Sequence, residues 1–494
     1  MLVGKTVYHL LYLLVCLNIG LFAAPEVVGQ STGLALTIGT LGVWRYSWAL
    51  INFIRAKIYL HIVFPRRRKA AERRYQDQKW RAHAFFLVTT YKIDPSITGP
   101  VYRSIFDAAA RSQGGATIVS SVVDASDVRL IKAIFALSDA SRSGLVSLKF
   151  DRIPGTGKRD ALATSMRTIA RLNPGWQDVI FLVDGDTRVP PDVVAQAAPF
   201  FTDPVMGAVT TDEVSEASGG RLFKDWFALR FSQRQMMMSS MGLSERVLTL
   251  TGRMSAFRGD LASDPTFIES VQHDFIDHWR FGRIDFLTGD DKSTWYWLLQ
   301  RGYKMGYLPD VKTVSVETQP REGFIDSAIV LMRRWFGNTL RTSNRALALP
   351  ASRIGYFTWW SILDQRMSMW TSLAGPCGML IATLVYNPFV LLFYLSWVML
   401  SRYVTCALIS TFRASRFPIT YPFLLYFGQL VGAMVKTYVL FRLDRQKWTR
   451  QTAATNTETK RGILASDRFS FYMHALAVGW LVLGMVWLVD ISGA

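Results

Sequence analysis

The sequence is poor in the residues from which disulfide frameworks and metal clusters are built. It contains three cysteines and six histidines in 494 residues. Cys16, Cys377 and Cys406 all lie in apolar runs, where a thiol behaves as a small buried hydrophobic side chain. The histidines show no metal-ligand spacing. These absences exclude a disulfide framework and a zinc framework.

Acidic residues are also scarce. The chain has 37 Asp and Glu against 56 Lys and Arg, which gives a formal charge of +19, and half of its residues are hydrophobic. This combination excludes a small domain, a disordered chain and an ordinary cytosolic enzyme. The apolar residues are concentrated near the two ends of the sequence. This distribution does not fit a chain of several soluble domains, each with its own hydrophobic core.

Two apolar runs begin the chain. They cover residues 7–24 and 33–54, and the second is interrupted mainly by Arg45. Each is close to the roughly 20 residues that cross a bilayer, so residues 1–54 are predicted to form two transmembrane helices. The first run could instead be a secretory signal ending near Ala24. The second run follows at once, which favours the two helices.

A basic juxtamembrane segment, residues 55–80, follows these runs, whereas the loop 25–33 between them carries no Lys or Arg. The positive-inside rule therefore predicts that the chain continues in the cytoplasm. A basic stretch can also indicate nucleic-acid binding. Its position beside a membrane span favours anionic lipid headgroups, so we expect membrane lipids and no nucleic acid as its partner.

The C-terminal part is predicted to return to the membrane. We expect an interfacial helix at 350–369, a transmembrane pair at 370–410 broken at Asn387 and Pro388, an interfacial or re-entrant segment at 411–441, and a last span at 471–490. The segment 411–441 is assigned to the interface because its flanks are basic and Lys436 lies within it. This gives five spans and an external C-terminus. Arg45 and Lys436 are candidates for lining a polar channel, although Arg45 fits snorkelling equally well.

Residues 81–349 have the composition of a soluble α/β domain. Short β-rich runs at 85–90, 116–123, 145–150, 179–183 and 208–211 alternate with helix-like stretches. Alternation of this kind predicts a mostly parallel sheet with helices on both faces. Ligands of such sheets bind at the carboxyl ends of the strands.

The strongest local signal is a buried strand that ends in Asp184, Gly185 and Asp186. Side chains two residues apart on an extended chain share a face, so both carboxylates can reach one hard divalent ion, Mg²⁺ or Mn²⁺, that also holds a nucleotide. An ordinary turn would use the same residues. Other polar residues at strand ends favour the metal and nucleotide site.

Two further strand ends carry groups that suit a nucleotide. Tyr91 could lie against a base and Asp124 could accept hydrogen bonds from the base or ribose. The glycine loop 155–157 then adds Lys158 and Arg159. It is not a P-loop, because the first glycine and the magnesium-binding hydroxyl of that motif are missing.

Asp290 and Asp291 open a helical stretch that continues to Gln300. Acids are favoured in the first turn of any helix, but one of the two could instead act as a general base at the rim of a cleft. Further along, Arg334 and Trp335 combine a cation with a flat ring. They suit a membrane surface, or a diphosphate and a sugar ring.

This ordered set resembles the membrane-embedded, processive family 2 glycosyltransferases, which include cellulose, chitin, hyaluronan and alginate synthases. The likeness extends from Tyr91 to about Gln451. Within the family, the stretches 153–162, 251–259, 289–295 and 333–341 are most similar to the alginate polymerases, the mannuronan synthases. The resemblance implies a GT-A-like α/β domain inserted between transmembrane helices.

The resemblance also implies roles for the matching positions. Asp291, with Asp290 beside it, would be the catalytic base, and Trp335 would stack under the acceptor sugar. The donor-binding residues would be Tyr91, Asp124, Lys158, Arg159, Asp184, Asp186 and Arg334, with Asp184 and Asp186 also holding the metal. One position departs from the family: Leu331 stands where a Gln is usual, so the contacts of that Gln must be absent or made otherwise.

The segment 442–462 resembles the gating loop that closes over the nucleotide in this family. The matching residues are Lys447, Trp448, Thr449, Arg450 and Gln451. Without the resemblance, the same stretch fits a basic juxtamembrane loop.

The function implied is that of an inverting polymerase. It would join mannuronate from GDP-mannuronate into a β-1,4-linked polysaccharide and pass the growing polymer across the bacterial inner membrane, with the catalytic domain in the cytoplasm. A PilZ-type domain is not visible in the sequence, so the resemblance implies a separate co-polymerase subunit that binds a cyclic dinucleotide. Two alternatives remain open: a synthase that makes another β-linked polymer from a UDP-sugar, and a non-processive transferase that glycosylates a lipid carrier.

Overall fold

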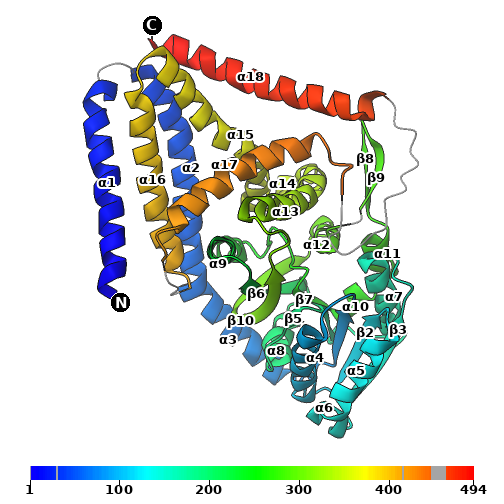
Figure 1. Ribbon diagram of the computed structural model, residues 1–494. Coiled ribbons are helices and arrows are strands. Elements are labelled where there is room, and N and C mark those ends of the chain that lie inside the picture. Colours follow the sequence, from blue (N-terminus) through cyan, green and yellow to red (C-terminus); the bar gives the residue numbers. More distant parts are fainter. Residues whose placement is uncertain (1, 29–31, 287, 414–416, 447–462, 494) are drawn as a thin grey trace.

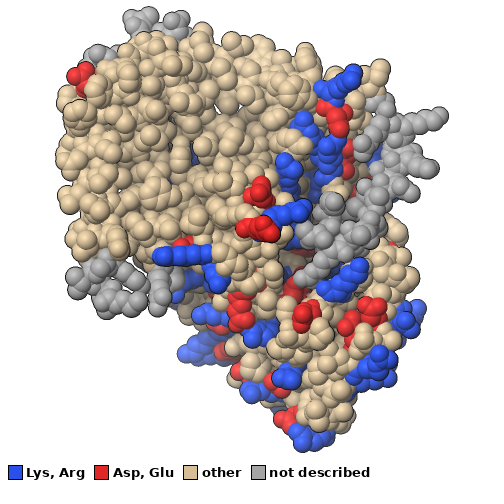
Figure 2. Space-filling view, in the orientation of Figure 1, with Lys and Arg blue, Asp and Glu red and all other residues tan. Residues whose placement is uncertain are grey.

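The computed structural model describes residues 2–28, 32–286, 288–413, 417–446 and 463–493. Long helices form one side of the molecule, and a sheet covered by helices forms the other (Figure 1). The outer surface of the helical part is almost uncharged, whereas Lys, Arg, Asp and Glu gather on the α/β part (Figure 2). This division matches a membrane part and a water-exposed part.

An eight-stranded sheet forms the centre of the α/β part. Its spatial order is β3-β2-β1-β4-β7-β6-β10-β5. The strands are β1 (Ala84–Thr89), β2 (Ala116–Val122), β3 (Val146–Arg152), β4 (Val179–Asp184), β5 (Thr187–Arg188), β6 (Met206–Ser218), β7 (Met254–Arg258) and β10 (Lys304–Thr318). A separate hairpin joins β8 (Phe275–His278) and β9 (Gly282–Asp285). The five β-rich runs of the sequence correspond to β1, β2, β3, β4 and β6.

The sheet is mixed. The pairs β3–β2, β2–β1, β1–β4 and β6–β10 are parallel, whereas β7 runs antiparallel to both β4 and β6. Buried apolar side chains of β1 and β4, such as Phe86 and Phe181, pack into the core at a ring-centre distance of 4.9 Å. The register places Thr89 opposite Asp184. The carboxyl ends of β1, β2 and β4 therefore meet at one edge of the sheet.

Helices cover this sheet. They are α4 (Pro95–Ala110), α5 (Ala125–Ala136), α6 (Asp139–Arg142), α7 (Lys158–Ala170), α8 (Val193–Ala197), the 3-10 turn η2 (Ala198–Thr202), α9 (Arg221–Gly242), α10 (Gly259–Ala262), α11 (Pro265–Gln272), α12 (Asp290–Gln300) and α13 (Phe324–Leu347). Local capping explains where several of them start. The Asp94 carboxylate accepts from Ser96 N, and Pro95 occupies the first turn of α4.

The other part consists mainly of long apolar helices. They are α1 (Leu2–Val28), α2 (Thr32–Ile58) with the π-turn η1 (Tyr59–Val63) and α3 (Phe64–Asp77), α14 (Ala351–Ile354), α15 (Tyr356–Val385), α16 (Phe389–Ser410), α17 (Tyr421–Leu440), and α18 (Asp467–Gly493) after the 3-10 turn η3 (Ile463–Ala465). Of the described residues, five stretches are long and apolar enough to cross a membrane: 6–27, 356–385, 389–410, 421–440 and 467–489. The chain is a multi-pass membrane protein.

These stretches differ from the expected spans in three places. Residues 350–369 and 370–386 were expected as an interfacial helix and a separate span, but α15 is continuous over Tyr356–Val385, with Pro376 accommodated inside it. The second expected span corresponds to α2, which is not among the five stretches. It carries Arg45 in its middle and Arg55 and Lys57 in its last turn.

Helix α17 lies between the two parts of the molecule (Figure 1) and packs on α13, α15 and α16. Gly432 of α17 lies against Phe336 and Met332 of α13. Lys436 of α17 donates to Ser368 Oγ of α15 at 2.9 Å. Residues 411–441 were expected as an interfacial or re-entrant segment, whereas 421–440 is among the five stretches long and apolar enough to cross a membrane. The interfacial assignment stays a prediction.

Candidate active site

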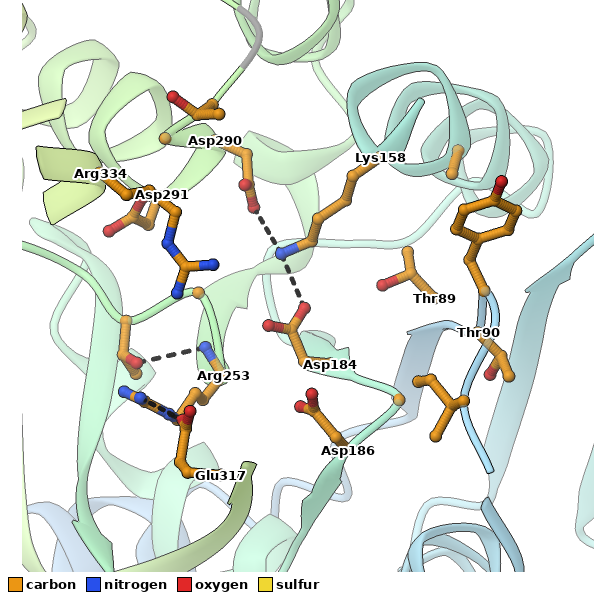
Figure 3. A pocket seen from close by; sticks show the side chains of 18 of the residues that line it. Thr89, Thr90, Lys158, Asp184, Asp186, Arg253, Asp290, Asp291, Glu317 and Arg334 are labelled. Atoms are coloured by element: carbon orange, nitrogen blue, oxygen red, sulfur yellow. Dashed lines mark hydrogen bonds and ion pairs between the residues drawn. The ribbon is translucent and has the colours of Figure 1, made fainter. Parts of the chain in front are cut away.

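A cleft of about 490 Å³ opens at the carboxyl ends of β1, β2 and β4. Thr89, Thr90 and Tyr91 line it from β1, and Asp184, Gly185 and Asp186 line it from β4. Gly185 is required there, because a side-chain carbon would come within 2.6 Å of Thr89 O. The tight turn directs both carboxylates toward the cleft (Figure 3).

Lys158 joins the two acidic pairs. Its Nζ lies 2.7 Å from Asp184 Oδ1 and 3.0 Å from Asp290 Oδ2 (Figure 3). Burial would lower the pKa of Lys158, but the two carboxylates outweigh burial and raise it. Lys158 is therefore a fixed positive charge between β4 and the start of α12.

Asp290 and Asp291 occupy different environments although they are adjacent. Asp290 is 8% exposed and is paired with Lys158. Asp291 is more exposed and lines the cleft, where Thr249 donates to its Oδ2 at 3.3 Å. Burial and the charge of Asp290 raise the pKa of Asp291, while Lys292 and Lys158 oppose the rise. Asp291 is thus the better placed of the two to accept a proton from a bound molecule.

The turn before Asp290 requires a glycine. Gly289 has a φ of 86°, in the left-handed region, and a side-chain carbon would meet Asn338 Cγ at 2.8 Å. Thr288 and Arg341 both donate to Asn338 Oδ1, each at 2.7 Å. The start of α12 is therefore held directly against α13.

Helix α13 brings Leu331, Arg334 and Trp335 to the cleft. Arg334 has no carboxylate within 4.0 Å in the part of the chain that is described; burial lowers its pKa, and the charges of Glu317 and Asp184 partly offset that effect. The Trp335 ring lies against Trp226 of α9 at a ring-centre distance of 5.8 Å. Leu331, at the position of the usual family Gln, contributes apolar surface.

Two of the predicted donor-binding residues are not among those lining the cleft. Arg159 is 6% exposed and donates to Val271 O at 2.5 Å and Ser293 Oγ at 3.0 Å. The Arg159 guanidinium therefore holds α7 against α11 and α12. It points away from the cleft that Lys158 lines. Asp124 begins α5, beside the cleft-lining residue Val123.

The predicted gating residues Lys447, Trp448, Thr449, Arg450 and Gln451 lie outside the described residues. The described chain ends just before them, at Gln446. Its amide donates to Asp285 O at 3.0 Å, and its Oε1 accepts from the Thr288 backbone N–H at 3.4 Å. The segment leading to the expected loop is thus attached beside Asp290.

The sequence did not reveal a buried ionic network along the other wall of the cleft. Arg253 donates to Glu317 Oε1 at 2.5 Å (Figure 3) and to Glu213 Oε2 at 2.9 Å. Both carboxylates overcome the effect of burial and raise the pKa of Arg253. Arg234 of α9 also lies 3.5 Å from Glu213. The only hint in the sequence was the family-like stretch 251–259, which contains Arg253.

Within the described residues, no group of three or more His, Cys, Asp or Glu side chains is placed to hold a metal ion. Asp184 and Asp186 nevertheless supply two hard oxygen ligands on one side of the cleft (Figure 3). Burial raises the pKa of Asp184, and the charge of Asp186 adds to that rise, although Lys158 opposes it. A divalent cation would relieve this repulsion, so the pair fits a metal whose other ligands come from a diphosphate and water.

The fold and this cleft define a class: a membrane-embedded α/β enzyme with acidic pairs and buried cations at the ends of its strands. The sequence profile described as "Glycosyltransferase like family 2" matches residues 82–338. The chain belongs to this family, and it is a glycosyltransferase. The expected family and the expected α/β fold are confirmed.

Two relatives extend the match beyond that domain. The chain is 44% identical over 424 residues to "Glycosyltransferase alg8" of Pseudomonas syringae pv. tomato, covering 85% of each protein. It is 42% identical over 459 residues to "Glycosyltransferase alg8" of Azotobacter vinelandii, covering 92% of each. The resemblance therefore includes the apolar helices as well as the cleft.

One solved structure is more distant. The mannosyltransferase PcManGT from Pyrobaculum calidifontis, in complex with GDP-Man and Mn2+, matches 82% of this chain and 98% of its own at 16% identity, with a TM-score of 0.48. At this low similarity, the ligands of that enzyme give no information about what this chain binds.

Proposed function

We propose that this glycosyltransferase is an inverting, processive polymerase that transfers mannuronate from GDP-mannuronate to a growing β-1,4-linked chain. One observation carries the proposal: a single cleft is lined by both aspartate pairs, Lys158, Arg334 and Trp335. Helix α13, which contributes Arg334 and Trp335, packs directly on the apolar helices α15 and α17. The two relatives named glycosyltransferase alg8 and the likeness to mannuronan synthases support mannuronate as the sugar.

The proposed reaction is a single displacement. The Asp291 carboxylate takes the proton of the acceptor hydroxyl, that oxygen forms a bond to the anomeric carbon of the donor, and the bond to the diphosphate breaks with inversion. Asp290, held by Lys158, keeps the first turn of α12 in place. Lys158 and Arg334 stabilise the negative charge on the departing diphosphate.

The donor is proposed to bind at the β1 and β4 side of the cleft. Tyr91 lies next to the glycine loop, since a side-chain carbon on Gly155 would be 3.8 Å from its ring, and it would face the base. Asp124 is proposed to contact the nucleoside from the end of β2. Asp184 and Asp186 would hold Mg²⁺ or Mn²⁺, which when bound would neutralise the diphosphate.

The acceptor is proposed to lie on the opposite side, against Trp335. The polymer would leave between the apolar helices and cross the bacterial inner membrane, with the α/β part in the cytoplasm as the basic segment 55–80 predicts. Residues 447–451 would close the cleft during transfer. A separate PilZ-type subunit would regulate polymerisation. These roles rest on the family resemblance.

A donor panel tests the proposed function. Purified membranes containing the protein would receive UDP-glucose, UDP-GlcNAc, GDP-mannose or GDP-mannuronate, and the product would be sized and its composition analysed. We expect a long polymer from GDP-mannuronate alone. A polymer from a UDP-sugar, or only short lipid-linked products, would overturn the proposal in favour of one of the two alternatives.

A further inference from the structure

Arg230 of α9 is a cation that the proposed reaction does not use. Its guanidinium carbon lies 4.4 Å from the ring centre of Trp335 and 5.1 Å from that of Trp226. In the described parts of the chain, it has no carboxylate within 4.0 Å and no hydrogen-bond partner. Burial and the nearby charge of Arg253 lower the pKa of Arg230 to about 10. Its charge is therefore uncompensated.

Lys436 of α17 continues this positive charge toward the apolar helices. Its Nζ donates to Ser368 Oγ and lies 4.9 Å from the ring centre of Phe336, and no described carboxylate lies within 4.0 Å of it. Arg230 and Arg45 lie close enough to repel the Lys436 ammonium group, and the Asp364 carboxylate offsets only part of that repulsion. Arg45 differs from the other two cations, because Asp364 neutralises it at 2.7 Å.

In the described residues, neither Arg230 nor Lys436 is in direct contact with a carboxylate, and two such cations are costly in a poorly solvated place unless an anion binds between them. Lys158 and Arg334 already serve the diphosphate in the proposed function. Arg230 lies on the Trp335 side, where the acceptor is proposed to bind. An anion at this place therefore belongs to the acceptor chain, and a uronic-acid polymer carries one carboxylate on every sugar.

The contacts of Arg230 suit a carboxylate. A guanidinium that lies against aromatic rings keeps its N–H edge available for two parallel hydrogen bonds. Bidentate pairing with a carboxylate gives both strength and orientation. The same rings provide the flat apolar surface on which a sugar packs.

We propose that Arg230 and Lys436 bind carboxylates of the uronic-acid units at the acceptor end of the polymer, and that Arg230 selects acidic over neutral acceptor sugars. This inference rests on the proposed function. It assigns acceptor selection to α9 and α17, away from the residues that hold the donor.

The test measures binding and does not require turnover. Purified full-length protein in detergent would be titrated with a β-1,4-linked oligouronate, and separately with the same oligosaccharide after its carboxyl groups are reduced to alcohols. We expect the native protein to prefer the acidic form by about tenfold or more, the effect of a charge-assisted hydrogen bond. Arg230→Gln should abolish most of that preference while GDP affinity is unchanged.

Three further variants separate charge, geometry and folding. Arg230→Lys keeps the charge but loses the paired N–H groups, so an intermediate preference is expected. Lys436→Gln should weaken the preference at least threefold even if Arg230 variants fold poorly. Arg221→Gln is the matched control on the same helix, because that side chain is 85% exposed, and it should change nothing.

Several results would overturn the inference. The inference fails if the native protein binds both oligosaccharides equally. It also fails if Arg230→Gln weakens binding of both to the same extent, because Arg230 would then only support the Trp335 ring. Loss of GDP affinity would assign Arg230 to the donor phosphates. If the donor panel yields a neutral polymer, the proposed function itself fails. If it yields polymannuronate while Arg230→Gln and Lys436→Gln keep the preference, only this inference fails.

Discussion

Asp290 and Asp291 are neighbours in sequence, but their surroundings divide two tasks between them. Lys158 neutralises Asp290 at 3.0 Å, whereas Asp291 meets the cleft with a raised pKa caused first by burial. A carboxylate that is not already paired with a cation can accept a proton more readily. The sequence alone could not separate the two, because helix capping explains either one.

Asp291→Asn should abolish sugar transfer while leaving nucleotide affinity nearly intact. The base acts on the acceptor hydroxyl, so its loss should lower the rate by about 10²–10⁴-fold. Radiolabelled sugar incorporation would measure the rate, and titration with GDP would measure the affinity. Asp139→Asn is a suitable control, because that exposed side chain lies on α6. Polymer synthesis at the native rate would refute the role of Asp291 as base.

Asp186→Ala should weaken donor binding only when a divalent cation is present, because the variant loses one hard oxygen ligand. EDTA should inactivate the native protein, and added Mg²⁺ or Mn²⁺ should restore activity. Donor affinity measured with and without metal would separate this effect from a folding defect. Full activity in EDTA would rule out the metal site.

At the scale of elements, hydrophobic pattern predicted the parallel half of the sheet well. The runs that became β1, β2 and β4 are short, buried and followed by polar residues, so both the strands and the edge that carries the cleft were recognisable. The strands β5, β7 and β10 of this sheet were missed, as was the β8–β9 hairpin. β10 (Lys304–Thr318) is continuously buried over residues 305–309 and alternates between buried and more exposed residues only after them, with a register shift between Leu308 and Lys312.

The ionic network of Glu213, Arg253 and Glu317 along one wall of the cleft could not be predicted, because it depends on packing between distant segments. Glu213 and Glu317 look like ordinary acids in the sequence. In the fold they surround Arg253, and Glu213 is fully buried. Arg159 shows the opposite case: its neighbour Lys158 reaches the cleft, but the helical rotation of about 100° per residue directs Arg159 elsewhere.

Trp335 tests the proposed acceptor side of α13. Trp335→Ala should reduce polymer synthesis severely, because the ring would hold the acceptor in position without taking part in bond making. Trp335→Phe should retain some activity, and donor binding should be unchanged in both variants. Trp279→Ala, which alters a ring that is 74% exposed, is the control. Normal synthesis by Trp335→Ala, or a defect limited to protein level, would make Trp335 an interfacial anchor.

At the scale of the whole molecule, the sheet and the apolar helices are joined by a buried ion pair. Arg413, just after α16, donates to Asp212 Oδ1 of β6 at 2.8 Å and to Glu213 O at 2.7 Å. Asp212 is 1% exposed and also accepts from Tyr307 OH at 2.9 Å. Because Glu213 continues to Arg253, this pair connects the membrane part to the wall of the cleft.

Arg413→Gln should destabilise the protein by about 3–5 kcal/mol, because it leaves the buried Asp212 carboxylate without its cation. Adding Asp212→Asn should recover much of the loss, since the unpaired charge disappears. Thermal unfolding in detergent, followed by tryptophan fluorescence, would measure both effects. Arg353→Gln, which alters an exposed side chain on α14, should leave the unfolding temperature unchanged.

The pH dependence of Arg413→Gln gives a second, independent check. Burial already raises the pKa of Asp212, and Arg413 opposes that rise, so the substitution should raise the pKa further. A carboxyl group whose pKa is higher in the folded state than in the unfolded state destabilises the protein while it is ionised, and this effect disappears as pH falls through the folded-state pKa. The stability difference between the native protein and Arg413→Gln should therefore narrow toward acidic pH. A difference that stays constant with pH would mean that Arg413 stabilises the junction by packing and its bond to Glu213 O, and that Asp212 carries no uncompensated charge in the variant.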